Sequence, residues 1–394
     1  MSRTTRRRTA ATLTAAATTA LLALTGTTAT AAAAPLSGTG TTATAAAAPL
    51  SGTGTTATAA AAPLSGTEAT VAVGARGAVP VVSPDGAKAY VVVTEADNTS
   101  TVKTVDTQTG AVTARLALGA LQWSAHPALS ADGSRLYVLD GQRLSVVDTA
   151  TLTLLATLAL PDQPRPAGWS TGSTSGLALS PDGSTLYVSQ NGATAYRQNG
   201  QSRILAFATA QRAFTASVQV PAPYVGAPAA RPGTGDVYVG TSQGVVHVAA
   251  AATAPTVAGT VRGTATNLDY NLAFTPDGKR LFGLAELGSG ASTVIDPATD
   301  TVTTTFHPAT GGDVLENPQV SADGTRLYLA DSNYGASSTS VLALDTATGA
   351  PVPADGAGDL DEDNLTGLAL GPDGHTFYVG GTAGQGANLQ IVAH

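Results

Sequence analysis

The chain has 394 residues, of which 43% are hydrophobic and 12% are charged, and it contains 44 glycines and 22 prolines. This apolar content excludes a protein that is disordered throughout, and the many turn-forming residues favour an all-β fold. The formal net charge of −8 argues against nucleic acid and anionic membrane surfaces as partners. The absence of cysteine excludes disulfides, a lipid-modified cysteine and covalently attached c-type haem.

Residues 1–31 have the pattern of an export signal peptide. Arginines gather at the start, an uncharged alanine-rich stretch spans residues 10–24, and an Ala-x-Ala cleavage motif occupies residues 29–31. The apolar stretch is too short to be a convincing membrane-spanning helix. We therefore expect a secreted, extracellular protein without membrane insertion. Removal of this segment would leave 15 basic and 27 acidic residues, a net charge of −12.

Residues 32–68 continue a low-complexity sequence of Ala, Thr, Gly and Pro. Three copies of Thr-Thr-Ala-Thr-Ala-Ala-Ala-Ala-Pro-Leu-Ser-Gly-Thr begin at Thr27, Thr41 and Thr55. Such a sequence buries too little apolar surface to offset the entropy lost on ordering, so we expect a disordered linker.

The remaining residues, 69–394, are organised by a repeated Ser-Pro-Asp-Gly phrase, which is clearest at residues 180–183 and is followed by Leu-Tyr-Val. In a tight turn, Pro presets φ, Asp bonds its own backbone, and Gly takes the left-handed position. Apolar alternation on both sides predicts a β-hairpin. The other copies have their aspartates at Asp85, Asp132, Asp277, Asp323 and Asp373, and a degenerate copy occupies residues 232–235.

A second hairpin follows within most repeats, as Val-Asp-Thr-Gln-Thr-Gly at residues 105–110 and Leu-Asp-Thr-Ala-Thr-Gly at residues 344–349. Consecutive turn aspartates lie 46 to 50 residues apart, except where the degenerate copy intervenes. Four short strands in each repeat of this length predict the blades of a β-propeller.

The Tyr-Val pair after the Asp-Gly turn and the Val-Asp-Thr-x-Thr-Gly hairpin resemble the YVTN-type seven-bladed β-propeller repeat family, a WD40-like architecture. The resemblance covers about residues 70–394 and implies the fold. It leaves the activity open, because related propellers include scaffolds, surface proteins, lactonases and cofactor-bearing oxidoreductases.

The last repeat provides strands at residues 368–370, 377–379 and 389–392 and then ends without a fourth. Residues 70–73 form a strand-like segment with no partner of their own. We predict that this segment completes the last blade, because such pairing leaves no open edge between the first and last blades. The expected fold is therefore all-β, a seven-bladed propeller of four-stranded blades closed by an N-terminal strand.

We label the four strands of each blade a, b, c and d in chain order, so that the Ser-Pro-Asp-Gly phrase links a to b. The a–b and c–d turns lie on one face of a propeller, and the b–c and d–a loops lie on the other. Irregular loops on a rigid scaffold are common binding sites, and aromatic and acidic side chains there suit a protein, peptide or carbohydrate ligand. The alternative is that these aromatic residues plug the channel or pack under their own loops. The candidate ligand-binding residues are Trp123, His126, Trp169, Tyr224, Asp269, Tyr270, His307, Glu316 and Tyr334.

One acidic segment resembles the start of a calcium-binding loop. Asp359, Asp361 and Asp363 occupy positions 1, 3 and 5 of such a loop, whose carboxylate oxygens suit calcium. Asn364 and Leu370 replace the glycine and the bidentate carboxylate that the loop needs, so a solvated acidic loop is the alternative. No other cofactor is expected.

No sequence motif assigns a catalytic residue, because the chain lacks a G-x-S-x-G elbow, an H-E-x-x-H pair and a phosphate-binding loop. We expect a monomeric extracellular binding or scaffold module that uses its b–c/d–a face. The alternative is a lactonase-type hydrolase at the channel mouth, with His126 or His307 as general base and Glu316 or Asp269 as orienting partner. A third option is an oxidoreductase with a non-covalent cofactor.

Overall fold

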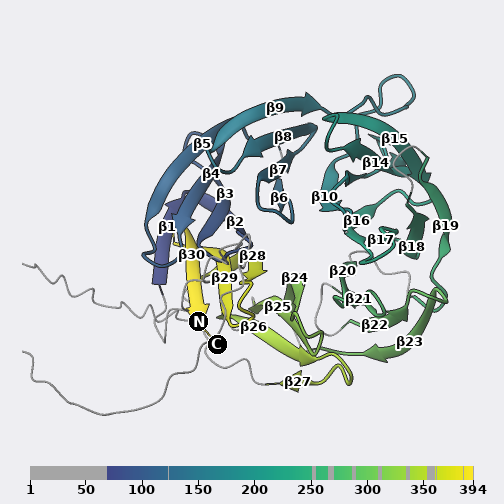
Figure 1. The fold of residues 1–394 in the computed structure, drawn as a ribbon. Coiled ribbons are helices and arrows are strands. Elements are labelled where there is room, and N and C mark those ends of the chain that lie inside the picture. Colours follow the sequence, from purple (N-terminus) through teal and green to yellow (C-terminus); the bar gives the residue numbers. More distant parts are fainter. Residues whose placement is uncertain are drawn as a thin grey trace, which may run out of the picture. The chain divides into compact units, whose positions relative to one another are not determined.

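The computed structural model describes residues 69–122, 124–250, 254–264, 270–285, 290–308, 313–333, 338–352, 360, 362–384 and 386–393, all within one compact unit of the chain. They form seven antiparallel four-stranded sheets that follow one another as blades around a central channel (Figure 1). The predicted seven-bladed, all-β fold is confirmed. The first strand of each blade lies beside the channel and is called the inner strand here.

The strands of each blade run from the channel outward. Blade 1 contains β2 (Arg76–Val82), β3 (Lys88–Thr94), β4 (Thr99–Asp106) and β5 (Val112–Ala120), and blade 2 contains β6 (Ala125–Leu129), β7 (Arg135–Asp140), β8 (Arg143–Asp148) and β9 (Thr153–Ala159). Blade 3 contains β10 (Thr174–Leu179), β11 (Thr185–Gln190), β14 (Ser202–Ala208) and β15 (Ala213–Val220), and blade 4 contains β16 (Val225–Ala230), β17 (Val237–Thr241), β18 (Gly244–Ala249) and β19 (Thr256–Thr260).

Blade 5 contains β20 (Tyr270–Phe274), β21 (Leu281–Ala285), β22 (Ser292–Asp296) and β23 (Thr301–Phe306). Blade 6 contains β24 (Asp313–Val320), β25 (Arg326–Asn333), β26 (Ser338–Asp345) and β27 (Pro351–Val352). Blade 7 contains β28 (Asn364–Leu370), β29 (Thr376–Ala383), β30 (Gly386–Ala393) and β1 (Ala69–Gly74). A short hairpin of β12 (Thr194–Ala195) and β13 (Gln198–Asn199) extends from blade 3 between β11 and β14.

The repeated turn satisfies its own polar groups. In blade 3 the Ser180 hydroxyl donates to Asp182 Oδ1 (2.6 Å) and accepts from the Thr185 backbone N–H (3.0 Å), while Gly183 has a φ of 68°. The same Ser/Thr-to-Asp pair recurs in blades 1, 2, 5 and 6. These hydrogen bonds explain why a hydroxyl residue opens the phrase, because each one satisfies the carboxylate and a backbone donor together.

The second hairpin is attached to the first through its threonine. Thr149 Oγ1 donates to the carbonyl oxygen of Gly133 at 2.5 Å in blade 2, and Thr107, Thr209 and Thr346 do the same in their own blades. This bond shows that the a–b and c–d turns share one face, as predicted. Tyr90 of blade 1 in turn contacts Thr149 of blade 2, so the repeated Tyr and Thr also join neighbouring blades.

The ring closes through strand β1. Residues Ala69–Gly74 pair with β30, with Val71 opposite Leu389, which confirms the predicted closure of blade 7 by the N-terminal strand. Val71 and Val73 are buried in a cluster with residues of β2, β3, β29 and β30. The closing strand therefore fills the core between the last and first blades.

The hydrophobic clusters lie between blades. One cluster joins Tyr137 and Leu139 of blade 2 to Leu186 and Phe207 of blade 3, and others join blades 3 and 4 or blades 6 and 7. Because each blade packs mainly on its two neighbours, the fold can extend beyond the usual size of a single-core domain.

Candidate ligand-binding site at the channel mouth

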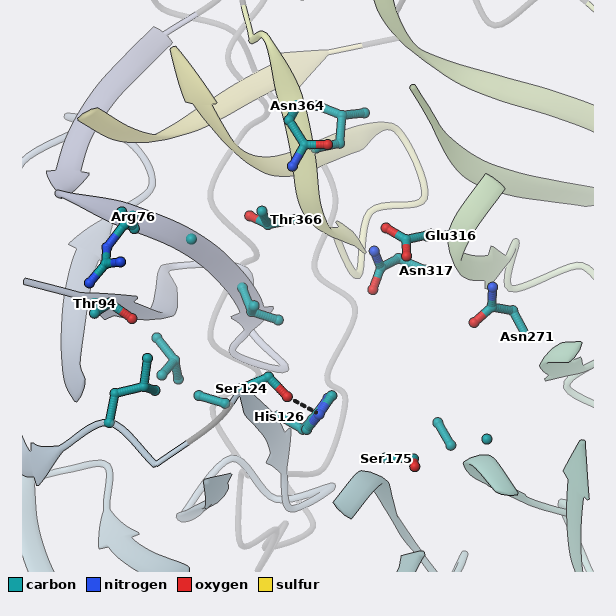
Figure 2. A pocket seen from close by; sticks show the side chains of 18 of the residues that line it. Arg76, Thr94, Ser124, His126, Ser175, Asn271, Glu316, Asn317, Asn364 and Thr366 are labelled. Carbon is teal, nitrogen blue, oxygen red and sulfur yellow. Dashed lines mark hydrogen bonds between the residues drawn. The ribbon is translucent and has the colours of Figure 1, made fainter. Parts of the chain in front are cut away.

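A cavity of about 1060 Å³ opens at the end of the channel where the inner strands begin. We call it the channel-mouth cavity (Figure 2). It lies on the b–c/d–a face, because its lining comes from the d–a loops, the starts of the inner strands and the ends of the second strands. All seven blades contribute. The polar lining residues are Arg76, Thr94, Ser124, His126, Ser175, Asn191, Tyr224, Asn271, Glu316, Asn317, Asn364 and Thr366.

Glu316 and Asn317 reach the cavity through an irregularity in β24. The register against β25 shifts between Glu316 and Gln319, and Asn317 adopts a left-handed φ of 52°. Pro318 follows and has no N–H for the ladder, which is typical of a bulge at the edge of a sheet. The bulge turns two consecutive side chains toward the channel, and Figure 2 shows them together on one wall.

Side chains also connect the inner strands of neighbouring blades. Asn271 of blade 5 donates from Nδ2 to the carbonyl oxygen of Leu315 in blade 6 at 3.1 Å. Thr366 of blade 7 accepts from the N–H of Ala78 in blade 1 (2.8 Å) and donates to its carbonyl oxygen (2.9 Å). These bonds satisfy backbone groups on the channel side of the inner strands, which their own sheets leave unpaired.

Glu316 is a half-buried carboxylic acid. Burial raises the pKa of its carboxyl above the ordinary value, and none of the described residues gives this side chain a hydrogen bond or an ion pair. Desolvation of this kind disfavours the ionised form.

His126 extends from β6 into the cavity and pairs with Ser124. The distance from Ser124 Oγ to His126 Nε2 is 3.0 Å (Figure 2). Burial lowers the pKa of His126, and the negative charge of Asp140 opposes this only in part. The carboxylate of Asp140 is itself held by the Gln122 N–H (2.9 Å) and by Arg143 (2.5 Å). His126 is therefore neutral at neutral pH.

Tyr224 of blade 4 lines the cavity, and its hydroxyl connects it to the β12–β13 hairpin of blade 3. Tyr224 is 43% exposed, and its hydroxyl accepts from Asn199 Nδ2 at 3.2 Å. Tyr196, at the tip of the β12–β13 hairpin, is 85% exposed with the Arg197 guanidinium over its ring at 5.2 Å. Trp169 is partly buried beside Gly200 and does not line the cavity. Trp169 therefore lies against the segment between β13 and β14 of its own blade.

The structure brings together only some of the predicted ligand-binding residues. His126, Tyr224 and Glu316 line the cavity. His307 follows β23, the outermost strand of blade 5, and its Nδ1 lies 3.2 Å from the Gly290 carbonyl oxygen, so it is not part of the lining. Trp123, Asp269, Tyr334 and the side chain of Tyr270 lie outside the described residues.

The predicted ligand-binding residues did not include five polar lining residues, namely Ser124, Ser175, Asn271, Asn317 and Thr366. Four of them lie within inner strands and not in long loops, and Ser124 immediately precedes one. A signal for most of them does exist in the repeat. The lining residues His126, Asn271 and Asn317 each stand six residues before their turn aspartate, and Ser175, Glu316 and Thr366 stand seven before theirs. Aligning the repeats on that aspartate identifies this part of the channel lining.

The predicted calcium loop is only partly described. Asp359 and Asp361 lie outside the described residues, and Asp363 accepts the N–H of Gly384 at 2.7 Å. In the described ranges, no three His, Cys, Asp or Glu residues are grouped so that they could hold a metal ion. Calcium binding therefore stays a prediction.

A smaller cavity of about 310 Å³ lies on the opposite face between blades 3 and 4. Ala250 lines it at the position where Thr107, Thr149, Thr209 and Thr346 stand in other blades. The missing hydroxyl and methyl group account for part of this space.

Comparisons with known proteins agree with the fold. No protein-family model matches the sequence, and no curated protein matches it. Solved structures of β-propellers are similar, among them a structure of U3-55K (TM-score 0.61, 11% identity, covering 84% of this chain and 100% of that chain). Another is the crystal structure of the RRP9 WD40 repeats (TM-score 0.62, 11% identity, 84% and 99% coverage). At this identity the similarity concerns the fold alone.

Among the residues that the structure describes, no helix is both long and apolar enough to pass through a bilayer.

Proposed function

We propose that this chain is a secreted propeller of the YVTN type that binds a peptide segment of a partner protein at its channel mouth. The main support for this proposal is the channel-mouth cavity, because residues from all seven blades line one opening. Its volume of about 1060 Å³ lies at the upper end of the range for ligand sites. The Tyr-Val and Asp-Thr turns support the YVTN type, and the signal-like residues 1–31 support secretion.

The rim favours a protein ligand. Tyrosine, tryptophan and arginine are the residue types that contribute most at protein interfaces, and Tyr196, Arg197 and Tyr224 lie beside the cavity or on the adjoining hairpin. Polar amides and hydroxyls inside the cavity offer hydrogen bonds to a peptide backbone. The similarity to WD40-repeat structures is consistent with this use, since such a fold presents several loops on one face.

The proposal is tested by selecting random displayed dodecapeptides on the full-length protein and measuring their affinity for two tryptophan variants. Ala227 is exposed in the lining of the cavity, so Ala227→Trp would obstruct it. Ala131 is exposed in the blade 2 turn on the opposite face, so Ala131→Trp is the matched control. Selected peptides should lose affinity only for Ala227→Trp. Selection of no peptide, or equal binding to both variants, would contradict the proposal, and a glycan array run in parallel reports a carbohydrate ligand instead.

A lactonase-type hydrolase is the second candidate, and the Ser124–His126 pair is the observation that favours it. In such an enzyme, Ser124 Oγ would attack the acyl carbon of the lactone while neutral His126 accepts its proton through Nε2. The ring C–O bond would then break, with His126 returning the proton to the departing alkoxide oxygen, and water would hydrolyse the acyl-serine to release the hydroxy acid. A panel of lactones and p-nitrophenyl esters separates the two functions. Turnover that is lost in Ser124→Ala and His126→Gln but kept in His307→Gln would establish the hydrolase, whereas a binding module gives no turnover above the buffer rate.

A further inference from the structure

The charged side chains of the channel-mouth cavity differ in their partners. In the described lining these are Arg76 and Glu316, and the imidazole of His126 is a third ionisable group, whose pKa burial lowers. Arg76 donates from Nη2 to Asn98 Oδ1 at 2.9 Å, and His126 is paired with Ser124. The ion pairs among described residues do not include Glu316. The cavity therefore contains one carboxylate to which its own cationic groups do not bind.

A desolvated carboxylate without a partner is unfavourable, because burial removes hydration that no protein group replaces. Burial accordingly raises the pKa of the Glu316 carboxyl. A cation supplied by a ligand would relieve this cost in the complex. The bulge in β24 holds Glu316 at the cavity wall, so the carboxylate is available to a group entering from the mouth.

We propose that the channel mouth takes an arginine side chain of the partner peptide, with its guanidinium group on the carboxylate of Glu316. This inference rests on the proposed peptide-binding function and names the feature of the peptide that the cavity recognises.

The surroundings of Glu316 favour a guanidinium over an ammonium group. Guanidinium presents five N–H donors in a fixed plane, so it benefits from several acceptors on one wall. Glu316 supplies two carboxylate oxygens, and Asn317 and Asn271 lie on the same wall (Figure 2). The Nδ2 group of Asn271 is committed to Leu315, which leaves its Oδ1 as an acceptor. A lysine ammonium group would use fewer of these oxygens.

The test uses Nα-acetyl-arginine amide as the probe, with Nα-acetyl-citrulline amide and Nα-acetyl-lysine amide as its analogues, titrated into the full-length protein by calorimetry. Citrulline keeps the shape of the side chain and removes its charge. We expect the arginine amide to bind at least about tenfold more tightly than the citrulline amide, and more tightly than the lysine amide. In Glu316→Gln the preference for arginine over citrulline should disappear. In Glu95→Gln, which removes an equivalent charge outside the cavity lining, the preference should remain.

Melting temperatures of both variants would check that they are folded, and the comparison of amides on the unaltered protein does not depend on any variant. Equal binding of the arginine and citrulline amides, absence of saturable binding, an equal or better affinity for lysine, or an arginine preference that persists in Glu316→Gln would overturn the inference. Peptides that bind in the cavity but tolerate replacement of every arginine by citrulline would overturn it while leaving the proposed function intact. Failure to select any peptide contradicts the proposed function itself.

Discussion

Carboxylates in the repeated turns and the carboxylate of Glu316 at the channel mouth have pKa values that shift in opposite directions. On the face of the repeated turns, the pKa values of Asp132 and Asp323 are lowered to about 2, because serine and backbone donors hydrogen-bond to the ionised groups. At the channel mouth, burial raises the pKa of Glu316 and no described residue compensates for it. The turn carboxylates are satisfied within their own hairpins, whereas none of the described residues hydrogen-bonds to the Glu316 carboxylate or forms an ion pair with it. This difference is the basis of the proposal that a ligand supplies the partner of Glu316.

The largest effect is expected where the ring closes, far from any ligand. A chain that begins at residue 76 should be much less stable than one that begins at residue 68, because β1 is lost from blade 7. Burial of the Val71 and Val73 side chains alone contributes about 3 to 6 kcal/mol to the free energy of unfolding, and the shorter chain loses this contribution. Calorimetric melting of the two chains measures the difference. Similar melting temperatures would mean that β1 is dispensable for closure.

Acid should lower the stability that the carboxylates of the repeated turns contribute to the fold. A carboxylate with a lowered folded-state pKa contributes stability above its unfolded pKa near 3.8, and this contribution is lost as the pH falls through the folded value. For Asp132 and Asp323 that window extends from about pH 4 to about pH 2. Urea unfolding at pH 5 and pH 2.5 should therefore give a lower midpoint at the lower pH. An unchanged midpoint would show that the turn carboxylates do not stabilise the fold.

Two serines of blade 3 allow a matched comparison. Ser180→Ala removes a donor to Asp182 and leaves the buried Thr185 N–H without its acceptor, so it should destabilise the protein by about 1 to 3 kcal/mol. Ser175→Ala, in the cavity lining, should change the free energy of unfolding by less than about 0.5 kcal/mol. Chemical denaturation gives both values. A larger loss of unfolding free energy in Ser175→Ala than in Ser180→Ala would contradict this prediction.

The smallest stability effects should differ in sign between the faces. Glu316→Gln removes a charge that is unfavourable in the folded state, so it should leave the melting temperature at pH 7 unchanged or slightly raise it. Asp182→Asn removes a charge that local donors stabilise, so it should lower that temperature. A thermal melt of each variant checks the signs. Destabilisation by Glu316→Gln would reveal a partner for this carboxylate and weaken its assignment to a ligand.

The regular face was predictable because its determinants are local. The serine, aspartate and glycine of each turn interact within a few residues, so the blades, their number and the closing strand followed from sequence spacing. The cavity depends on residues from all seven blades, whose convergence is set by the ring. His126, Tyr224 and Glu316, which line the cavity, were among the ligand-binding candidates chosen from the irregular loops of the sequence. Ser175 and Thr366 were not among the predicted residues, because a single polar residue within a strand has no neighbour in the sequence that indicates whether it faces the channel.

Hydrogen exchange with a selected peptide bound tests most directly the claim that one face holds the fold and the other binds. The inner strands pair on one edge only, so a ligand in the channel mouth would protect backbone amides at their starts. Mass spectrometry should show slower exchange in β6, β16 and β24 and unchanged exchange in the turns around Asp132 and Asp323. Protection confined to those turns would contradict the account.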